Sequence, residues 1–455
     1  MKRNLSTIQQ WLQVEGQLIE QQLVTGVCID SRRVQKGDLF IPFRGEQVNG
    51  HRFVKRAFEQ GAVAALWLKD EPNPPANVPL LFVDDVEQAL QQMARSYRNE
   101  LNCTIVGVTG SNGKTSTKDL LAGVLSPYFK VKKTEGNFNN ELGLPLTLLR
   151  VEDDTQVAIL EMGMSGFGEI SFLSTLAAPH FAVITNIGEA HMQDLGSREG
   201  IAKAKFEIID GLAKDGLLLY DGDEPLLRDL VSNQSSLRTV SFGYEQADLM
   251  TDQIQSTSKG STFTVYGKVE GTFTIPVYGA HQVKNALAAV IIARELGLTE
   301  AQIKSSLEQT KLTDMRMQPV AGENGSLLIN DAYNAAPTSM RAAFRFMRET
   351  TVREDKWLVL GDMLELGPEE QNYHEGLADD LKKLDLQGIV LFGSRMKWLA
   401  DQLTDYPAEV MWTASDAELV VDALRPRLTK DTVVLFKGSR GMKLERIMGP
   451  LEDVL

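Results

Sequence analysis

The chain has 455 residues, of which 43% are hydrophobic and 24% are charged. These proportions predict about three globular domains, each able to bury a core of its own. With 61 acidic and 47 basic side chains the net charge is -14, which argues against nucleic acid as a partner but leaves room for a local basic pocket that binds a small anion. No run of about 18 apolar residues predicts a membrane span. The N-terminal stretch lacks the apolar core of a signal peptide, so we expect a cytoplasmic protein.

The first part of the chain, residues 1–100, predicts a small α/β domain. Short strand-like stretches such as 38–43 accompany a helix near 52–60, and the prolines of residues 69–79 mark an exposed loop. A helix from Val86 to Leu101 leads into the next domain. Cys28 and Cys103 lie far apart without metal-type spacing, so we expect both to be reduced core residues.

The middle part, residues 101–313, predicts a central P-loop domain with a mainly parallel sheet. Apolar strands such as 157–160 and 181–184 alternate with helical stretches, the pattern of a parallel sheet covered by helices. Residues 238–278 are rich in Thr, Ser, Gly and Val and are expected to form antiparallel hairpins. A helix follows them, because apolar residues recur at helical spacing from Val283 to Ile291.

The last part, residues 314–455, repeats the alternation and predicts a separate, Rossmann-like α/β domain. Its expected strands are 327–329, 357–360, 389–392 and 433–436. The helices between them carry apolar stripes, one of which includes Met340, Ala343, Phe344 and Met347. The predicted fold class is therefore α/β, with three domains.

A glycine-rich turn, TGSNGKTST from Thr109 to Thr117, joins a β-branched strand to a helix-like stretch. The general phosphate-loop pattern places a glycine where this chain has Val108, so the strict motif fails. The physical requirements are still met: N–H groups of the turn face an anion, Lys114 adds a positive charge, and Thr115 offers a hydroxyl to Mg²⁺. A tight turn without a ligand is the alternative, but strand, turn and helix in this order favour a nucleotide site.

Two polar side chains follow neighbouring strands of the predicted central sheet. Glu161 ends the strand 157–160, and His191 comes shortly after the strand 181–184. Ligands of parallel sheets bind at the carboxyl ends of strands, and Mg²⁺ prefers oxygen ligands. Each residue alone is more often structural, but together, beside a phosphate loop, they favour a metal site.

Lys203 and Lys205 lie on opposite sides of the predicted helix 197–212. Lys203 stands between Glu199 and Glu207 at helical spacing, which is typical of a solvated face. Lys205 shares its side with four apolar residues: Ile201, Ile208, Ile209 and Leu212. One interpretation is a stem that packs on the core while the ammonium reaches water. The other is a buried neutral amine that reacts with CO₂ to give a metal-binding carbamate.

Three further stretches carry weaker signals. Residues 279–287 open a helix with polar groups that suit either a nucleotide base or a helix cap. The stretch from Asp331 to Asn334 suits either a ribose-binding site or a turn. The stretch from Lys437 to Gly441 suits either a carboxylate-binding site or a solvated basic loop. His180 is expected to be structural.

Over all three parts, the sequence resembles the Mur ligases. The matching stretches are Asp30-Ser31-Arg32 with Gly45 and Gly50 to Phe53, Thr109 to Thr115, Glu135 to Gly143, His191, Ala204-Lys205, Gly279 to Leu287, Asp331 to Asn334, Gly361 to Gly367 and Lys437 to Arg440. Because they span the chain, the similarity is far more specific than the phosphate loop alone. The asparagine-rich stretch and the Gly-Asp-Met segment favour the member that adds a D-alanyl-D-alanine dipeptide over the member that adds the third peptide residue.

The resemblance implies an ATP-dependent amide ligase of peptidoglycan precursor synthesis. Its substrates would be UDP-N-acetylmuramoyl-tripeptide and D-alanyl-D-alanine, and we expect a monomer. The implied ATP-binding residues are Gly110, Ser111, Asn112, Gly113, Lys114, Thr115, Ser116, Asn285, Arg316 and Asp331.

The resemblance also implies two Mg²⁺ ions. One would be bound by Thr115 and Glu161, the other by His191 and a carbamylated Lys205. The family's modified lysine follows its metal histidine by about fourteen residues, as Lys205 follows His191. Lys114, Lys205 and His191 would be the catalytic residues.

The same resemblance implies two sets of substrate-binding residues. The UDP-substrate set is Ser31, Arg32, Gly45, Asn49, His51, Asn137, Asn139 and Asn140. The dipeptide set is Tyr333, Asn334, Lys437, Ser439 and Arg440. The chain departs from the family's Asp-Ser-Tyr-Asn-Ala-Asn-Pro at Ala332 and Ala336, which therefore supply no polar side-chain contacts, and it has Asn49 where Asp is common.

Two other functions compete with this one. Another ligase of the superfamily would add glutamate to folate, or a single amino acid to the growing peptide. A P-loop switch would hydrolyse ATP slowly to change partners. Such a switch has no need of Glu161, His191 and Lys205 together, and its ATPase activity would not require two peptide substrates.

Overall fold

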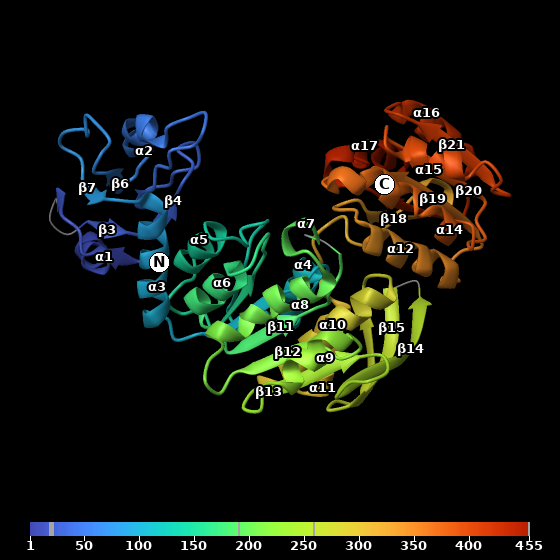
Figure 1. The fold of residues 1–455 in the computed structure, drawn as a ribbon, viewed down its shortest axis with the longest axis horizontal. Helices are drawn as coiled ribbons and strands as arrows, with labels where there is room; N and C mark the ends of the chain where they lie inside the picture. Colours follow the sequence, from blue (N-terminus) through green and yellow to red (C-terminus); the bar gives the residue numbers. More distant parts are fainter. Residues whose placement is uncertain (18–21, 190–191, 258–259, 454–455) are drawn as a thin grey trace.

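The computed structural model describes residues 1–17, 22–189, 192–257 and 260–453. Its three lobes form an arc, with the first (blue) and last (red) lobes at the two ends and the central lobe between them (Figure 1). Each lobe contains its own main β-sheet. Among the described residues no helix is long and apolar enough to cross a membrane. The predicted α/β class is confirmed.

The first lobe contains a five-stranded sheet of order β2-β7-β6-β5-β4, in which only β2 runs antiparallel to its neighbour. Its strands are β2 (Gly16–Gln17), β4 (Gly26–Cys28), β5 (Asp38–Phe40), β6 (Ala64–Leu68) and β7 (Leu80–Val83), and a separate pair is formed by β1 (Arg3–Asn4) and β3 (Leu23–Val24). Its helices are α1 (Leu5–Leu12), α2 (Val54–Glu59) and α3 (Val86–Glu100). Cys28 and Cys103 are buried and free, as expected.

The central lobe is built on a nine-stranded sheet of order β16-β15-β14-β13-β12-β11-β8-β10-β9. Its strands are β8 (Thr104–Thr109), β9 (Val131–Lys133), β10 (Val157–Glu161), β11 (Phe181–Ile184), β12 (Leu217–Asp221), β13 (Arg238–Gly243), β14 (Leu249–Thr257), β15 (Gly260–Gly267) and β16 (Gly271–Ile275). Its helices are α4 (Lys114–Leu125), α5 (Gly143–Leu149), α6 (Glu169–Ala177), α7 (Met192–Leu195), α8 (Arg198–Phe206), α9 (Pro225–Ser232), α10 (Ala280–Glu295) and α11 (Glu300–Glu308).

Two details of the central lobe differ from the sequence-based expectation. The stretch 238–278 forms antiparallel pairs only from β14 onward, because β13 pairs in parallel with both β12 and β14. The expected helix 197–212 is α8 followed by a 3₁₀ turn, Glu207–Gly211. Ser197 starts α8 as predicted, since its side chain accepts a hydrogen bond from the N–H of Gly200.

The last lobe is a six-stranded sheet of order β17-β18-β22-β19-β20-β21, parallel except for the edge strand β17. Its strands are β17 (Gln318–Ala321), β18 (Leu327–Asp331), β19 (Asp355–Gly361), β20 (Gly388–Phe392), β21 (Glu409–Thr413) and β22 (Thr432–Lys437). Its helices are α12 (Pro337–Glu349), α13 (Glu370–Glu375), α14 (Ala378–Leu381), α15 (Met396–Gln402), α16 (Ala417–Leu424) and α17 (Glu445–Met448). The predicted apolar stripe of α12 is buried.

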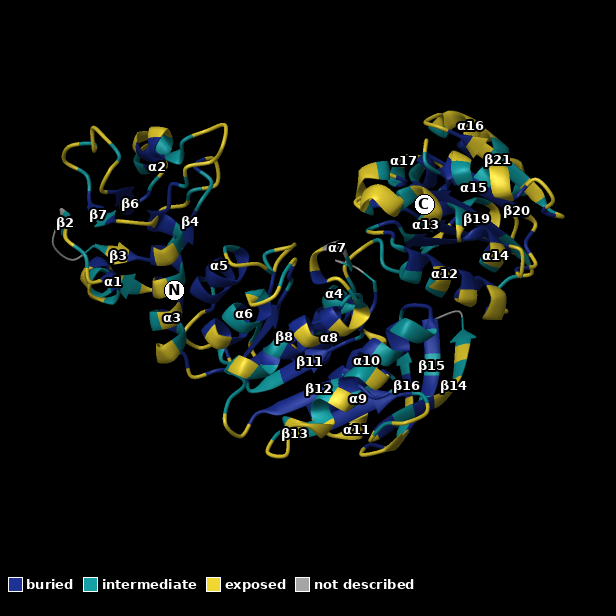
Figure 2. Ribbon diagram, viewed as in Figure 1, coloured by how far each residue is buried: buried dark blue, intermediate teal, exposed yellow. Residues whose placement is uncertain are grey.

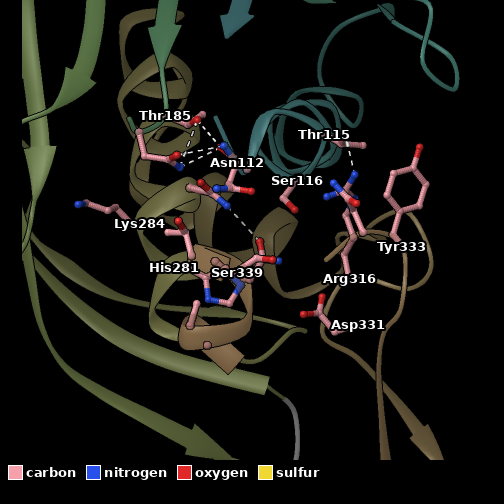
Figure 3. Close-up of a pocket in the computed structure, with 18 of the residues that line it drawn as sticks. Asn112, Thr115, Ser116, Thr185, His281, Lys284, Arg316, Asp331, Tyr333 and Ser339 are labelled. Atoms are coloured by element: carbon pink, nitrogen blue, oxygen red, sulfur yellow. Dashed lines mark hydrogen bonds between the residues drawn. The ribbon is translucent and has the colours of Figure 1, made fainter. Parts of the chain in front are cut away.

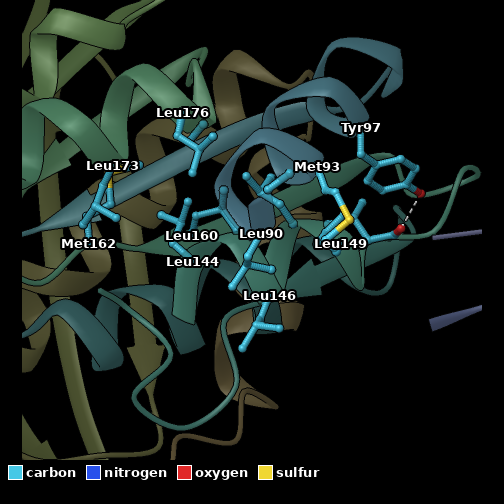
Figure 4. Packing of buried hydrophobic residues seen from close by; sticks show 14 of the residues in the cluster. Leu90, Met93, Tyr97, Leu144, Leu146, Leu149, Leu160, Met162, Leu173 and Leu176 are labelled. Atoms are coloured by element: carbon cyan, nitrogen blue, oxygen red, sulfur yellow. Dashed lines mark hydrogen bonds between the residues drawn. The ribbon is translucent and has the colours of Figure 1, made fainter. Parts of the chain in front are cut away.

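Buried residues run through the middle of every lobe, and in the central sheet the strands β8, β10, β11 and β12 are almost entirely buried, whereas β14 is partly exposed (Figure 2). One apolar cluster joins the first two lobes. In it, Leu90, Met93 and Tyr97 of α3 pack with leucines of α5 and α6 (Figure 4). The helix α3 therefore belongs to both cores. The described clusters of the last lobe include one central-lobe residue, Tyr278, whose ring lies 5.5 Å from that of Phe346.

Candidate functional site

The turn between β8 and α4 has the backbone geometry of an anion-binding loop. Gly110 and Gly113 adopt φ values of +147° and +81°, which favour glycine. A Cβ at Gly110 would lie 1.9 Å from Thr185 Oγ1, and one at Gly113 would lie 2.5 Å from Asn285 Oδ1. Both glycines are therefore required by conformation and by close approach.

The loop is braced by the end of the neighbouring strand β11. The N–H of Asn112 donates to Asn186 Oδ1 at 3.0 Å, and Thr185 Oγ1 donates to the Asn112 carbonyl at 2.5 Å. The N–H of Gly188 donates to Ser111 Oγ at 2.9 Å. Sequence reasoning assigned no role to Thr185 or Asn186, although their position after a strand that adjoins β8 is a usable signal.

Lys114 starts α4 and turns its ammonium back onto the loop. Its Nζ donates to the Gly110 carbonyl at 2.7 Å. Burial lowers the pKa of Lys114; Glu161 opposes this shift and Arg316 adds to it. An anion bound in the loop would stabilise the charged form of this amine.

The side-chain oxygens of Thr115 and Glu161, which were predicted to bind the same Mg²⁺, lie next to each other. Thr115 Oγ1 donates to Glu161 Oε2 at 3.0 Å, and Asn139 Nδ2 donates to Glu161 Oε1 at 3.0 Å. Lys118 Nζ lies 3.5 Å from Glu161 Oε2, so this buried carboxylate has a cation beside it. Mg²⁺ binds oxygen ligands, and in nucleotide sites it takes one or two of them from the protein and the rest from water and phosphate. A hydroxyl and a carboxylate next to a phosphate loop suit this requirement. These residues therefore fit one of the two implied metal ions.

The second implied metal site is only partly described. Lys205 is 2% exposed, so the alternative in which its ammonium reaches water is wrong. Burial, aided by the charge of Lys114, places the pKa of Lys205 well below its usual value. No described residue forms a hydrogen bond or ion pair with this amine. His191 lies outside the described residues, and within them no cluster of three or more His, Cys, Asp or Glu side chains could hold a metal.

A cavity of about 1160 Å³ opens beside the phosphate loop, between the central and last lobes. The predicted ATP-binding residues that line it are Ser111, Asn112, Gly113, Lys114, Thr115, Ser116, Asn285, Arg316 and Asp331 (Figure 3). The predicted dipeptide residues Tyr333, Asn334, Lys437, Ser439 and Arg440 line the same cavity, as do Asn137 and Asn139. The structure therefore gathers most of the predicted ATP set, the whole dipeptide set and two of the eight UDP-substrate residues around one cavity.

The α10 side of this cavity carries polar groups suited to a base. Asn285 Nδ2 donates to Gln282 Oε1 at 3.2 Å, and burial lowers the pKa of His281 to about 4, so its imidazole is neutral at pH 7. Lys284 forms ion pairs with Asp221 and Asp223 at 2.6 and 3.1 Å. Sequence reasoning missed this ion-paired cluster, because its members come from separate strands and loops.

The last lobe contributes cations and an acidic partner. Arg316 Nη2 donates to Thr115 Oγ1 at 3.2 Å, and its guanidinium lies 4.3 Å from the centre of the Tyr333 ring. Lys437 Nζ pairs with Asp331 Oδ2 at 2.6 Å and also donates to the Asn334 carbonyl. Arg316, 201 positions along the chain, thus reaches the Thr115 hydroxyl of the phosphate loop.

Other contacts tie predicted dipeptide residues to their surroundings. Ser439 Oγ accepts from the N–H of Leu364, and Arg440 pairs with Glu445 at 2.7 Å. Thr338 at the start of α12 donates to Glu189 in the loop after β11. This is a second hydrogen bond between the last and central lobes, in addition to that of Arg316 with Thr115.

The remaining UDP-substrate residues do not line this cavity. Asn49 and His51 form an internal network: Asn49 donates to Glu71, and His51 Nε2 accepts from the N–H of Leu68 at 3.3 Å. Arg32 is exposed and pairs with Asp30 at 2.8 Å. The others are Ser31, Gly45 and Asn140, of which Asn140 accepts from the N–H of Gly143 at the start of α5.

The fold and the site together define a class of protein. A mainly parallel sheet with a glycine-rich phosphate loop, a hydroxyl and a carboxylate that fit magnesium, and an arginine from a second α/β lobe are typical of a nucleotide-dependent enzyme of the P-loop class. Three domain families match the chain: the Mur ligase family catalytic domain at residues 23–98, the Mur ligase middle domain at 108–293 and the Mur ligase glutamate ligase domain at 315–440. The chain belongs to the Mur ligase family.

Relatives match over nearly the whole length. The chain is 44% identical to the UDP-N-acetylmuramoyl-tripeptide--D-alanyl-D-alanine ligase of Bacillus subtilis (strain 168), covering 95% of this chain and 94% of that protein. The ligase of the same name from Escherichia coli (strain K12) is 31% identical, over 94% and 93%. A crystal structure of MurF from Acinetobacter baumannii matches with a TM-score of 0.89 at 30% identity, over 99% of both chains. MurF ligase from Thermotoga maritima in complex with ADP matches at 0.83 and 28% identity, over 94% and 96%.

Proposed function

We propose that this protein is an ATP-dependent amide ligase that joins D-alanyl-D-alanine to UDP-N-acetylmuramoyl-tripeptide in peptidoglycan precursor synthesis. The observation that carries the proposal is the convergence of Lys114, Glu161, Arg316 and Lys437 on one cavity, in a chain that matches ligases of this name from end to end. A P-loop switch does not need two lobes that share one substrate-sized cavity.

The proposed reaction activates a carboxylate, because a carboxylate oxygen is a poor leaving group. The terminal carboxylate of the tripeptide attacks the γ-phosphorus of ATP, which forms an acyl phosphate and releases ADP. The amine of D-alanyl-D-alanine then attacks the acyl carbon, loses a proton, and expels phosphate. Lys114 and Arg316 stabilise charge on the phosphoryl oxygens, and the loop N–H groups hold the phosphates in line. Magnesium held by Thr115 and Glu161 would neutralise further phosphate charge.

For the substrates, we assign the UDP end to residues of the first lobe and the dipeptide to the set around Lys437. Asn137 and Asn139 lie between these regions in the sequence and line the cavity, which suits the peptide arm.

The domain limits that we infer are 1–100, 101–313 and 314–455. We also infer that the protein is a monomer and that it is located in the cytoplasm. The strands of the three main sheets lie within these limits.

A carbamylated Lys205 is the proposed second metal ligand, with His191. Its burial and lowered pKa support this proposal, because only a neutral amine reacts with CO₂. Native mass spectrometry in bicarbonate is expected to show a labile addition of one CO₂ that the Lys205→Arg variant lacks. An activity that survives unchanged in Lys205→Ala would refute a ligand role.

The function is tested with a substrate panel. The enzyme, ATP and Mg²⁺ are incubated with D-alanyl-D-alanine and UDP-muramoyl tripeptides that end in either lysine or diaminopimelate, and products are weighed by mass spectrometry. One ADP is expected for each amide formed, and none from Lys114→Ala. Parallel reactions with glutamate or single amino acids distinguish another ligase of the superfamily. A rate of ATP hydrolysis that does not depend on either peptide substrate would favour a P-loop switch.

A further inference from the structure

Asp119 is a fully buried carboxylate in the phosphate-loop helix, and it binds the segment that leads to the last lobe. Its Oδ1 accepts from Lys133 Nζ at 2.6 Å. Its Oδ2 accepts from both the N–H and the Oγ1 of Thr313, at 2.9 and 2.6 Å. Thr313 lies between α11 and β17, so this carboxylate ties the start of the segment that leads to the last lobe to the phosphate-loop helix.

The connecting segment is held at a second point on the same helix. Thr115 and Asp119 are one helical turn apart and face the same side of α4. Thr313 binds Asp119, and Arg316 Nη2 donates to Thr115 Oγ1 at 3.2 Å. Residues 313–316 therefore lie along one turn of α4, attached at both ends.

Between and just beyond these points the backbone takes an unfavourable path. Met315 and Met317 have φ values of +66° and +54°, in the left-handed region that non-glycine residues rarely adopt. The Met315 carbonyl accepts from the N–H of Tyr333, and the N–H of Met317 donates to Asp331 Oδ1 at 3.2 Å. A path of this kind persists only where surrounding contacts hold it.

The side chain that this path presents is Arg316. Its Nε is buried without a hydrogen-bond partner among the described residues. Burial by itself would raise the pKa of Asp119, but hydrogen bonds from Lys133 and Thr313 outweigh it and keep the carboxyl ionised. The Asp119 carboxylate is therefore charged and buried, and it accepts three hydrogen bonds, which gives it the strength to hold a strained segment.

We propose that Asp119 is a positioning residue: by fixing Thr313 on the phosphate-loop helix, it sets the approach of Arg316 to Thr115 and to the nucleotide phosphates. The proposal deepens the proposed ATP site and rests on it. Asp119 touches no reacting atom and acts through Arg316.

The test compares threonine variants by their affinity for the non-hydrolysable analogue AMP-PNP with Mg²⁺. Thr313→Val removes the hydroxyl donor and keeps the shape, and a lost hydrogen bond to a buried charge predicts about tenfold weaker binding. Thr313→Ser retains the hydroxyl and is expected to restore affinity. Thr310→Val is the control, because Thr310, although buried where Thr313 is exposed, also donates its hydroxyl, but only locally, to the Ser306 carbonyl at 2.9 Å. Its affinity is expected to equal that of the wild type.

A double-mutant cycle separates positioning from general destabilisation. With Arg316→Ala as background, Thr313→Val is expected to change affinity less than about twofold, because the side chain it positions is gone. The same tenfold loss in both backgrounds, or equal losses in Thr313→Val and Thr310→Val, would overturn the inference. Wild-type protein that fails to bind AMP-PNP would instead contradict the proposed function, so the two failures are distinguishable.

Discussion

Gly113 shows at the scale of one residue how the nucleotide site depends on a missing side chain. Its φ of +81° is left-handed, and the amide of Asn285 on α10 occupies the space where a Cβ would lie. The phosphate loop and α10 can therefore come this close only because residue 113 has a hydrogen atom in place of a side chain.

Gly113→Ala is expected to weaken AMP-PNP binding by about tenfold or more, because the new methyl displaces Asn285 as well as straining the loop. Calorimetric titration measures this. Gly168→Ala is the matched control: Gly168 has a φ of +83° with nothing within 4 Å of its Cβ position. It is expected to lose about 1 kcal/mol of stability and no nucleotide affinity. Equal affinities in the two variants would contradict the steric role.

His281 gives the site a predictable response to acid. Its pKa of about 4 in the fold is below the usual unfolded value of about 6.5, so the stabilisation is present above pH 6.5 and is lost as the pH falls toward 4. Wild-type protein is expected to lose up to about 3 kcal/mol more unfolding free energy over this interval than His281→Gln. Denaturant titrations at several pH values measure the difference. Parallel curves for the two proteins would contradict the prediction.

Single residues also show where sequence reasoning stopped. The apolar stripe placed Lys205 beside the core, because helical periodicity is a local property, but it left open whether the ammonium reaches water, and the structure buries it. Asn49 and His51 matched a family motif, yet both are engaged in hydrogen bonds within the first lobe. A motif identifies residue types, whereas the partners of their polar atoms depend on packing.

At the scale of elements, α11 begins with a reciprocal cap that the sequence pattern Thr299-x-x-Gln302 encodes. The Gln302 N–H donates to Thr299 Oγ1, and Gln302 Oε1 accepts from the Thr299 N–H at 2.8 Å. Thr299→Ala is expected to lower the unfolding free energy by about 1 kcal/mol and leave ligase activity unchanged. Ser305→Ala, at an exposed position of the same helix, should stay within about 0.5 kcal/mol of the wild type. Indistinguishable denaturation midpoints for the two variants would exclude the cap's contribution.

Strand directions were harder to predict than helices. The helix α10 was predicted from apolar residues at helical spacing, and in the structure it is buried on all sides from Asn285 to Ala293. The parallel pairing of β13 was missed, because its composition resembles that of the hairpin strands β14 to β16 and says nothing of which neighbour a strand joins. Pairing is decided by the crossover through α9.

At the scale of the whole molecule, the first two lobes share a large apolar cluster, whereas the described apolar contact of the central lobe with the cluster of the last lobe runs through Tyr278, which packs against Phe346. Contacts between the central and last lobes include the polar pairs of Arg316 with Thr115 and Thr338 with Glu189, around a large cavity. Lobes joined in this way are expected to unfold as separate cooperative units.

Differential scanning calorimetry tests this division. Leu90→Ala, in the shared cluster, and Leu391→Ala, in β20, each remove a fully buried side chain and are expected to cost about 2–5 kcal/mol. Each should lower a different thermal transition. A single transition that shifts equally in both variants would show that the three lobes unfold together.

The sequence by itself determined what is local: the glycines and Lys114 of the phosphate loop, the place of Lys205 among apolar residues, the helical spacing of α10 and the stripe of α12. These follow from backbone preferences and from periodicity, which act over a few residues. Only the tertiary structure decided that Arg316 meets Thr115 and that Thr313 meets Asp119. Those contacts join residues about two hundred positions apart, and their partners are selected by how whole lobes pack rather than by any neighbouring residue.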